Sequence, residues 1–214
     1  GKQDDFVAFA RDVAKATLAS GATEPDAVLG LKGPDGATFE ERRRALIAKI
    51  GENITVRRIA RANADGVLGS YLHGTRIGAL VALKGGDAAL AKDLAMHVAA
   101  INPAYVDSTQ VPADELAKER EIQMAKAQNE SKGKPADVLA KMVEGRIRKH
   151  LAEITLVGQP FVKDPDTSVE KLLKQADASV TAFARLEVGA GIEKKQENFA
   201  DEVAAQVKAS SEKR

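Results

Sequence analysis

The sequence predicts an α+β fold, in which helices pack on a small antiparallel sheet, and three observations support this. Two apolar, alternating runs, Val67–His73 and Ile77–Lys84, are separated by a short polar turn, which is typical of a β-hairpin. Segments on both sides carry apolar residues at helical spacing. A charged, Ala-rich stretch over residues 114–130 precedes a tight turn and another helical pattern. This last pattern predicts an inserted antiparallel helical hairpin, or coiled-coil arm.

The composition favours a soluble cytoplasmic protein that acts without a metal. Hydrophobic residues make up 44% of the chain, which suffices for a core, but with aromatics at only 4% that core must be aliphatic. The absence of cysteine excludes disulfides and thiolate chemistry, and three scattered histidines argue against a metal site. Because 32 basic residues balance 31 acidic ones, nucleic acid is not an expected partner. Neither a membrane span nor a signal peptide is indicated.

The N-terminal third reads as two helices and a strand. Asp4 or Asp5 is expected to cap a helix that stops at Gly21, followed by a loop over residues 22–37. A capping box then begins a second helix, with Thr38 as N-cap, Glu41 three residues later and Gly51 as a left-handed C-cap. Its apolar stripe comprises Phe39, Leu46, Ile47 and Ile50. Residues 53–60 alternate as a strand would.

Beyond the hairpin, Asp87 starts a helix whose inward residues are expected to be Leu90, Leu94, Val98 and Ile101. The limb over residues 114–130 is too poor in large apolar groups to be enclosed by a globular body, so we expect the arm to project. After the arm, residues 155–161 are expected to form a strand, and Thr167 with Glu170 a second capping box. A last strand over residues 178–188 should place its apolar positions on one side, namely Val180, Ala182, Ala184, Leu186 and Val188. The arm therefore interrupts one sheet.

A search for chemistry in the sequence predicts no enzyme. Dinucleotide and Walker-type glycine patterns are absent. His73 has no orienting carboxylate at a fixed spacing, so we weigh a general base against an exposed turn residue and an interface residue. His97 is expected to be structural. Two basic runs, residues 42–44 and 146–149, lack interleaved aromatics, and RNA contact is only an alternative. We expect no cofactor and a protein whose surfaces bind a partner.

Six motifs, in order and correctly spaced, resemble bacterial elongation factor Ts. They are AKIGENITVRR (48–58), GSYLHGTRIGALVAL (69–83), AMHVAAINP (95–103), KMVEGRIRKH (141–150), LVGQPFVKDP (156–165) and LEVGAGIEK (186–194). The resemblance implies a guanine-nucleotide exchange factor for elongation factor Tu, acting in translation elongation. Such a factor and the nucleotide weaken each other's binding to Tu reciprocally. The alternative is an RNA-associated translation accessory, or a dimerisation module without exchange activity.

The resemblance also implies which residues contact Tu. Ile50 and Gly51 match positions that meet the nucleotide-binding domain, although both also suit a helix end. His73, with Tyr71 and Gly74 beside it, matches the loop that approaches the Tu helix following its phosphate loop. Val162 matches a contact to another Tu domain, and an ordinary core valine is the alternative. Phe199 matches the C-terminal module that also docks on Tu.

Four parts are implied by the same resemblance. They are a remnant of the N-terminal core subdomain (1–66), the C-terminal core subdomain (67–105 and 155–189), an inserted coiled-coil or dimerisation arm (106–154) and a C-terminal helical module (190–214). The arm suggests a homodimer. The family's N-terminal helical domain and its T-D-F-V motif are expected to be missing here, which would leave partial Tu binding with impaired exchange.

Overall fold

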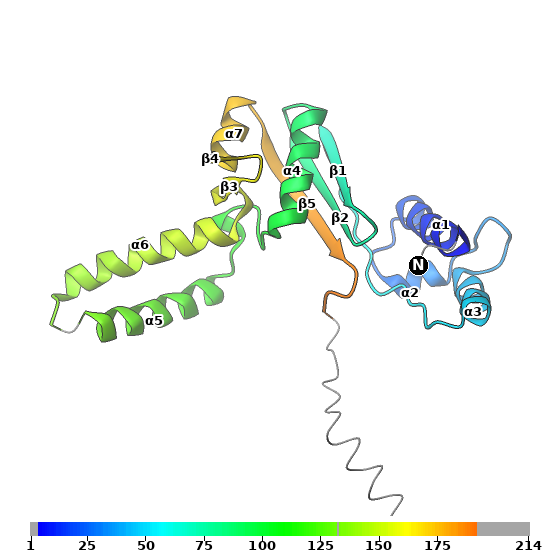
Figure 1. The fold of residues 1–214 in the computed structure, drawn as a ribbon, viewed down its shortest axis with the longest axis horizontal. Helices are drawn as coiled ribbons and strands as arrows, with labels where there is room; N and C mark the ends of the chain where they lie inside the picture. The colour runs from blue at the N-terminus through cyan, green and yellow to red at the C-terminus, as the bar shows by residue number, and fades with distance from the viewer. Residues whose placement is uncertain (1–3, 132, 192–214) are drawn as a thin grey trace, which may run out of the picture.

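The computed structural model describes residues 4–131 and 133–191. It has helices α1–α3 at one end, a sheet covered by α4 in the middle and the α5–α6 pair at the other end (Figure 1). Within the described residues, no helix is long and apolar enough to cross a membrane. The helices are α1 (Asp4–Ser20), α2 (Pro25–Leu29), α3 (Phe39–Ile50), α4 (Ala88–Ile101), α5 (Ala113–Glu130), α6 (Ala136–Ile154) and α7 (Val169–Gln175). The strands are β1 (Val67–His73), β2 (Ile77–Lys84), β3 (Pro160–Phe161), β4 (Asp164–Ser168) and β5 (Ser179–Glu187).

The predicted α+β class and the hairpin are both confirmed. Strands β1 and β2 pair antiparallel, with Val67 opposite Leu83 and His73 opposite Ile77. Strand β5 pairs with the other edge of β2, so the sheet order is β1-β2-β5 and the arm interrupts the sheet in sequence. One face of this sheet is covered by α4 (Figure 1).

Strand β5 departs from the predicted one-sided pattern because it contains a bulge. Val180 lies opposite Leu83, but the next step along β2, Ala82, lies opposite Ala182. The extra residue shifts the alternation by one position, so Val180 and Phe183 both pack on the core. The predicted stripe is therefore wrong beyond the bulge: Ala182 and the residues that alternate with it lie on the opposite face from Val180.

Helix α4 buries a face centred on its alanines. Ala91, Leu94, Ala95 and Val98 are fully buried, whereas Ile101, predicted to point inward, is 47% exposed. Spacing of large apolar residues alone misplaced this face, because the small residues mark the line of closest approach to the sheet. Gly69 on β1 makes that approach feasible, since a Cβ there would lie 2.2 Å from the backbone of Ala91.

Two predictions in the N-terminal part are wrong. The expected loop over residues 22–37 contains helix α2, which begins at Pro25. Residues 53–60 are not a strand. Ile54 is buried and Val56 and Ile59 pack partly on the N-terminal core, but no strand pairs with this segment within the described residues. An alternating pattern forms a strand only when a neighbouring strand supplies hydrogen bonds.

Two predictions after the arm also need correction. The expected strand over residues 155–161 contains a 3₁₀ turn, Leu156–Gly158, and only its last two residues form a strand, β3. The N-cap of α7 is Ser168, whose hydroxyl accepts from the Lys171 N–H (3.2 Å), so the expected box of Thr167 and Glu170 is off by one residue. Strand β4 runs through Thr167 to Ser168, and the helix begins directly after it at Val169.

The arm is a pair of contacting helices that extends away from the sheet (Figure 1). Its interior is small, and the fully enclosed side chains are Ala127, Val143 and Ile147. Ion pairs join the two limbs, one between Arg120 and Glu144 at 3.0 Å. Because exposed pairs of this kind contribute only fractions of a kcal/mol, the apolar seam holds the limbs together.

We predict that Gly69→Ala lowers the free energy of unfolding by at least about 2 kcal/mol, because the new methyl group overlaps the α4 backbone. Gly145→Ala in α6 is the matched control: beyond the nearby backbone of its own helix, its added Cβ meets nothing within 4 Å, and it should stabilise by about 0.5–1 kcal/mol. Urea unfolding followed by circular dichroism measures both. Equal effects of the two variants would contradict the packing described above.

Candidate functional site

The tip of the β1–β2 hairpin presents His73 in a fixed conformation. The Arg76 N–H donates to the His73 carbonyl (3.2 Å), and Gly74 between them has φ +58°. Because His73 pairs with Ile77, the three residues Gly74, Thr75 and Arg76 form the loop, and among them only Gly74 has a positive φ. His73 is exposed, as the interpretations of this residue as a turn residue and as an interface residue both require.

Neighbouring groups hold this tip in place. Tyr71 lies on the same face of β1 and is half-buried, with its ring centroid 6.4 Å from that of His73. The Val188 N–H donates to the Arg76 carbonyl (2.9 Å), and Arg76 pairs with Glu187 (3.4 Å). That carboxylate is therefore engaged by arginine rather than by the imidazole. Among the described residues, no carboxylate forms a hydrogen bond with His73, so the acid partner that a catalytic base needs is not found there.

The second predicted contact, Ile50–Gly51, is the end of helix α3. Ile50 packs partly on the N-terminal core, and Gly51 adopts φ +79° while its N–H donates to the Ile47 carbonyl (2.8 Å). The predicted capping box at the start of this helix is confirmed, since the Glu41 N–H donates to Thr38 and the Thr38 N–H to Glu41. Helix α3 is thus fixed at both ends, and its last residue reaches the surface.

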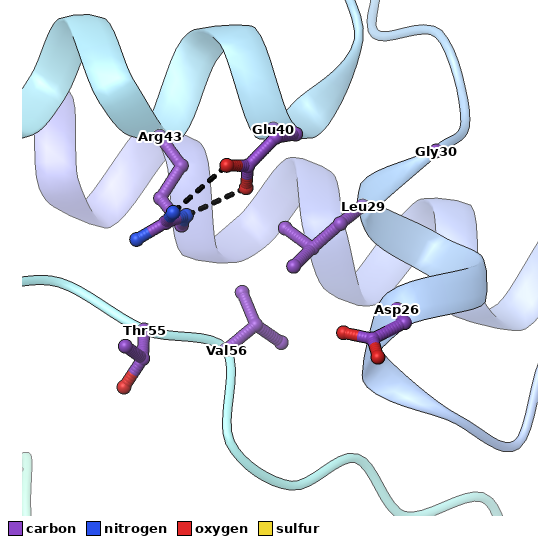
Figure 2. A pocket seen from close by; sticks show the side chains of 7 residues that line it. All are labelled: Asp26, Leu29, Gly30, Glu40, Arg43, Thr55 and Val56. Carbon is purple, nitrogen blue, oxygen red and sulfur yellow. Dashed lines mark hydrogen bonds and ion pairs between the residues drawn. The ribbon is translucent and has the colours of Figure 1, made fainter.

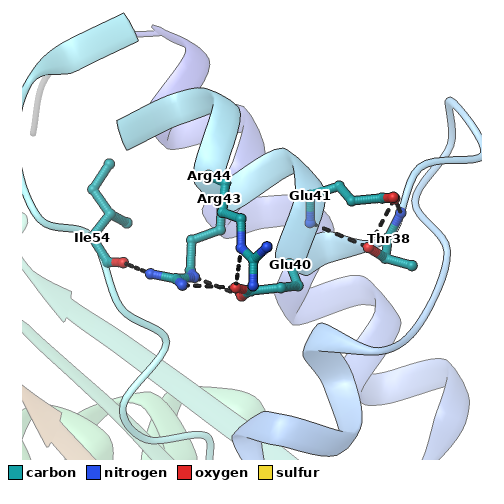
Figure 3. A network of polar contacts seen from close by, with 6 residues as sticks. All are labelled: Thr38, Glu40, Glu41, Arg43, Arg44 and Ile54. Carbon is teal, nitrogen blue, oxygen red and sulfur yellow. Dashed lines mark hydrogen bonds and ion pairs between the residues drawn. The ribbon is translucent and has the colours of Figure 1, made fainter. Parts of the chain in front are cut away.

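A network of charges ties α3 to the segment that follows Gly51 (Figure 3). The Glu40 carboxylate accepts from Arg43 Nε (2.7 Å) and Arg44 Nε (2.8 Å), and Arg43 Nη1 donates to the Ile54 carbonyl (2.7 Å). These arginine hydrogen bonds lower the pKa of Glu40 to about 2. The network holds the chain in the sharp corner that exposes Gly51.

The same ion pair forms one wall of a hollow of about 520 Å³ between α2, α3 and residues 55–56 (Figure 2). Leu29, Val56 and Asp26 line the opposite wall. Both charged groups of the pair are already matched, so neither is available as a base. Among the described residues, no group of three His, Asp or Glu side chains could hold a metal ion.

The segment that follows the corner at Gly51 reaches the end of the sheet that carries the hairpin turn. The segment leaving Gly51 reaches the end of β5, where Arg58 Nη2 donates to the Glu187 carbonyl and Arg57 Nη2 to the Ala190 carbonyl, both at 2.6 Å. Glu187 is the residue that pairs with Arg76 of the hairpin turn. We name Ile50, Gly51, Tyr71, His73 and Gly74 together the tip surface.

Val162 lies elsewhere, near the base of the arm. It is 37% exposed, so the alternative of an ordinary core valine is wrong. It lines an apolar hollow of about 430 Å³ that we name the Val162 hollow, lined by Ile101, Glu153, Gln159, Pro160, Phe161, Val162 and Pro165. Sequence reasoning missed Ile101 here, because a large apolar residue at the end of a helix pattern was assigned to the core. Phe199 lies outside the described residues.

Comparison with known proteins decides the family. The family model described as Elongation factor TS matches residues 1–190. The chain belongs to this family. Elongation factor Ts of Methylococcus capsulatus is 59% identical over 210 residues, which cover 98% of this chain and 71% of that protein. The protein of Thioalkalivibrio sulfidiphilus is 58% identical, over 97% of this chain and 70% of its own length. That of Hydrogenovibrio crunogenus is 53% identical, with 95% and 69% covered.

The sequence resemblance is thereby confirmed. Elongation factor Ts is the guanine-nucleotide exchange factor for elongation factor Tu, and it binds Tu in translation elongation. It is an exchange factor rather than an enzyme, so the interpretation of His73 as a general base is wrong.

We predict a pH-dependent contribution of Glu40 to stability. Its folded pKa lies below the ordinary value of 4.5, so the contribution is complete above that pH and is lost as the pH falls towards about 2. The urea midpoint of Glu40→Gln should therefore lie below that of the unmodified chain at neutral pH, and the gap should narrow in acid. Arg44→Gln, which keeps the ion pair between Glu40 and Arg43, should lose less stability than Glu40→Gln. If the urea midpoints of Glu40→Gln and of the unmodified chain differ by the same amount at neutral and at acid pH, the charge network is contradicted.

Proposed function

We propose that this chain promotes GDP release by pressing two preformed surfaces on Tu, the tip surface and the Val162 hollow. The observation that carries the proposal is the exposed imidazole at a hairpin tip held by backbone hydrogen bonds. A surface that is already ordered loses little conformational entropy when it binds, so more of its interaction energy remains to disturb the partner.

The tip surface is assigned to the nucleotide-binding domain of Tu. His73 approaches the helix that follows the phosphate loop, and Ile50 with Gly51 meets the same domain. Contact there weakens the hold of Tu on magnesium and phosphate. Since the two binding equilibria are linked, GDP and this chain lower each other's affinity for Tu by the same factor.

The Val162 hollow is assigned to a second domain of Tu. Exposed Val162 and Ile101 rim a floor made by buried Phe161, which is suited to an apolar side chain of the partner. A second contact orients the chain on Tu, so that the tip surface meets the nucleotide site in one defined pose. Phe199 of the segment 190–214 remains a predicted third contact.

The arm is assigned to self-association. Residues 106–154 are divided from the rest by their own apolar seam, and Ile122 on α5 is 47% exposed. The other two apolar clusters, among α1–α3 and under the sheet, support the proposed division into parts at residues 1–66 and 67–105 with 155–189. Light scattering tests the homodimer: Ile122→Glu should shift a dimeric chain towards monomer.

We predict that His73→Ala weakens Tu binding by about 1–2 kcal/mol, the usual cost at an interface residue, and slows GDP release. His150→Ala, on α6 of the arm, is the matched control and should change neither. Calorimetry gives the affinity, and stopped-flow with a fluorescent GDP gives the release rate. Unchanged binding by His73→Ala would remove the tip surface from the proposal.

We predict that Val162→Ala weakens Tu binding by about 1 kcal/mol through lost apolar contact. Val7→Ala on α1 is a close control, since Val7 is exposed to a similar extent, 42% against 37%. The same calorimetric titration measures both. Equal affinities for the two variants would argue that Val162 lies outside the interface.

A further inference from the structure

A buried histidine lies directly behind the Val162 hollow and makes no contact with the tip surface. His97 on α4 is fully buried, and both ring nitrogens are engaged. Its Nδ1 accepts from the Val162 N–H at 3.1 Å, and its Nε2 lies 2.9 Å from Gln159 Oε1. A backbone N–H can only donate, so Nδ1 carries no proton and the ring proton is on Nε2.

The other end of this chain of hydrogen bonds leads to the same assignment. Gln159 Nε2 donates to the Glu153 carbonyl at 2.6 Å, and a carbonyl can only accept. The amide oxygen of Gln159 must therefore face His97, which requires a proton on Nε2. Two backbone groups at opposite ends thus select the same neutral tautomer of the imidazole.

The chain of bonds fixes the segment that carries Val162. The imidazole also stacks on Phe161, with ring centroids 6.0 Å apart and planes at 26°. Lys163, on the other side of Val162, pairs with Asp93 of α4 at 2.9 Å. Residues 161–163 are therefore attached to α4 at three successive positions, while the Val162 side chain is left 37% exposed.

We propose that His97 is a positioning residue for Tu binding: its neutral imidazole holds the Val162 backbone so that the side chain faces the partner. This inference rests on the proposed contact of Val162 with Tu. His97 itself stays buried and touches no partner atom. Its effect on binding passes entirely through residues 161–163.

Protonation of the His97 ring would remove its hold on the Val162 backbone. An imidazolium has no acceptor, so Nδ1–H would oppose the Val162 N–H. Burial lowers the pKa of His97, and the Gln159 hydrogen bond opposes that change more weakly. Charged groups on the surrounding elements are Asp93 paired with Lys163, Arg185 on the Ala99 carbonyl, and Glu153 on α6. The contribution of the neutral ring to stability is complete above pH 6.5 and is lost as the pH falls through the lowered pKa.

A pair of variants tests the proposal in the full chain. His97→Asn places an oxygen acceptor near the position of Nδ1 but does not titrate, whereas His97→Leu keeps apolar volume and offers no acceptor. At pH about 7.5, calorimetry with Tu should show His97→Leu binding about threefold to tenfold more weakly, the range for one lost hydrogen bond, and His97→Asn retaining most of the affinity.

A double-mutant cycle separates positioning from a general loss of stability. His97→Leu combined with Val162→Ala should cost less than the product of the single effects, because both act on one contact. When His97→Leu is combined with His73→Ala, the loss of affinity should equal the product of the two single losses, because the two residues act on separate contacts. If Val162→Ala alone leaves binding unchanged, the proposed Val162 contact fails. The positioning role is overturned if Val162→Ala weakens binding but His97→Leu does not. It is also overturned if the loss of affinity in the double variant equals the product of the two single losses.

A pH series decides the matter if His97→Leu does not fold. As the pH is lowered from about 7.5 until the imidazole nitrogen shifts show that His97 has become protonated, the unmodified chain should lose more Tu affinity than His97→Asn, because only the unmodified chain gains the opposing proton. Equal losses in the two proteins would reject the proposal. Nitrogen chemical shifts of the imidazole, with an Nε2-protonated tautomer at neutral pH, provide an independent check on the geometry.

Discussion

The close packing of α4 on one face of the β1-β2-β5 sheet is the constraint on which the other features depend. It brings the backbone of Ala91 against Gly69, where no side chain fits. From this contact, the hairpin extends to its exposed tip at one end of the sheet. Helix α4 carries His97 to the segment of Val162 at its other side. The hairpin tip and the Val162 hollow are therefore both mounted on a single helix–sheet unit, whereas Ile50 and Gly51 belong to the separate N-terminal core.

An exchange factor needs rigidity for an energetic reason. It performs no chemistry, so all of its effect must come from interaction energy that distinguishes nucleotide-bound from nucleotide-free Tu. Energy spent on ordering its own loops would be lost from that difference. The turn at Gly74, the corner at Gly51 and the attachment of Val162 to His97 share this property. In each case backbone hydrogen bonds, rather than partner contacts, set the conformation.

Sequence patterns predicted the candidate site unevenly. The exposed histidine follows from a short polar turn between alternating runs, and Gly51 follows from a capping box that starts thirteen residues earlier. Ile101 was assigned to the core because helical spacing does not show where the sheet ends. The bond between His97 and Val162 joins residues 65 positions apart, and a sequence spacing carries no information about it. The family resemblance predicted Val162 as a contact residue but did not predict that His97 positions it.

The sequence by itself determined the local structure: the capping box at Thr38, the left-handed glycines, the hairpin register and the two limbs of the arm. Each depends on residues only a few positions apart, whose hydrogen bonds and side-chain spacing are settled within one turn or hairpin. The tertiary structure alone decided the bulge in β5 and the alanine-centred face of α4, and it left residues 53–60 without a strand partner in the described part of the chain. These depend on which distant segment lies alongside, and pairing and packing partners are chosen by the whole fold.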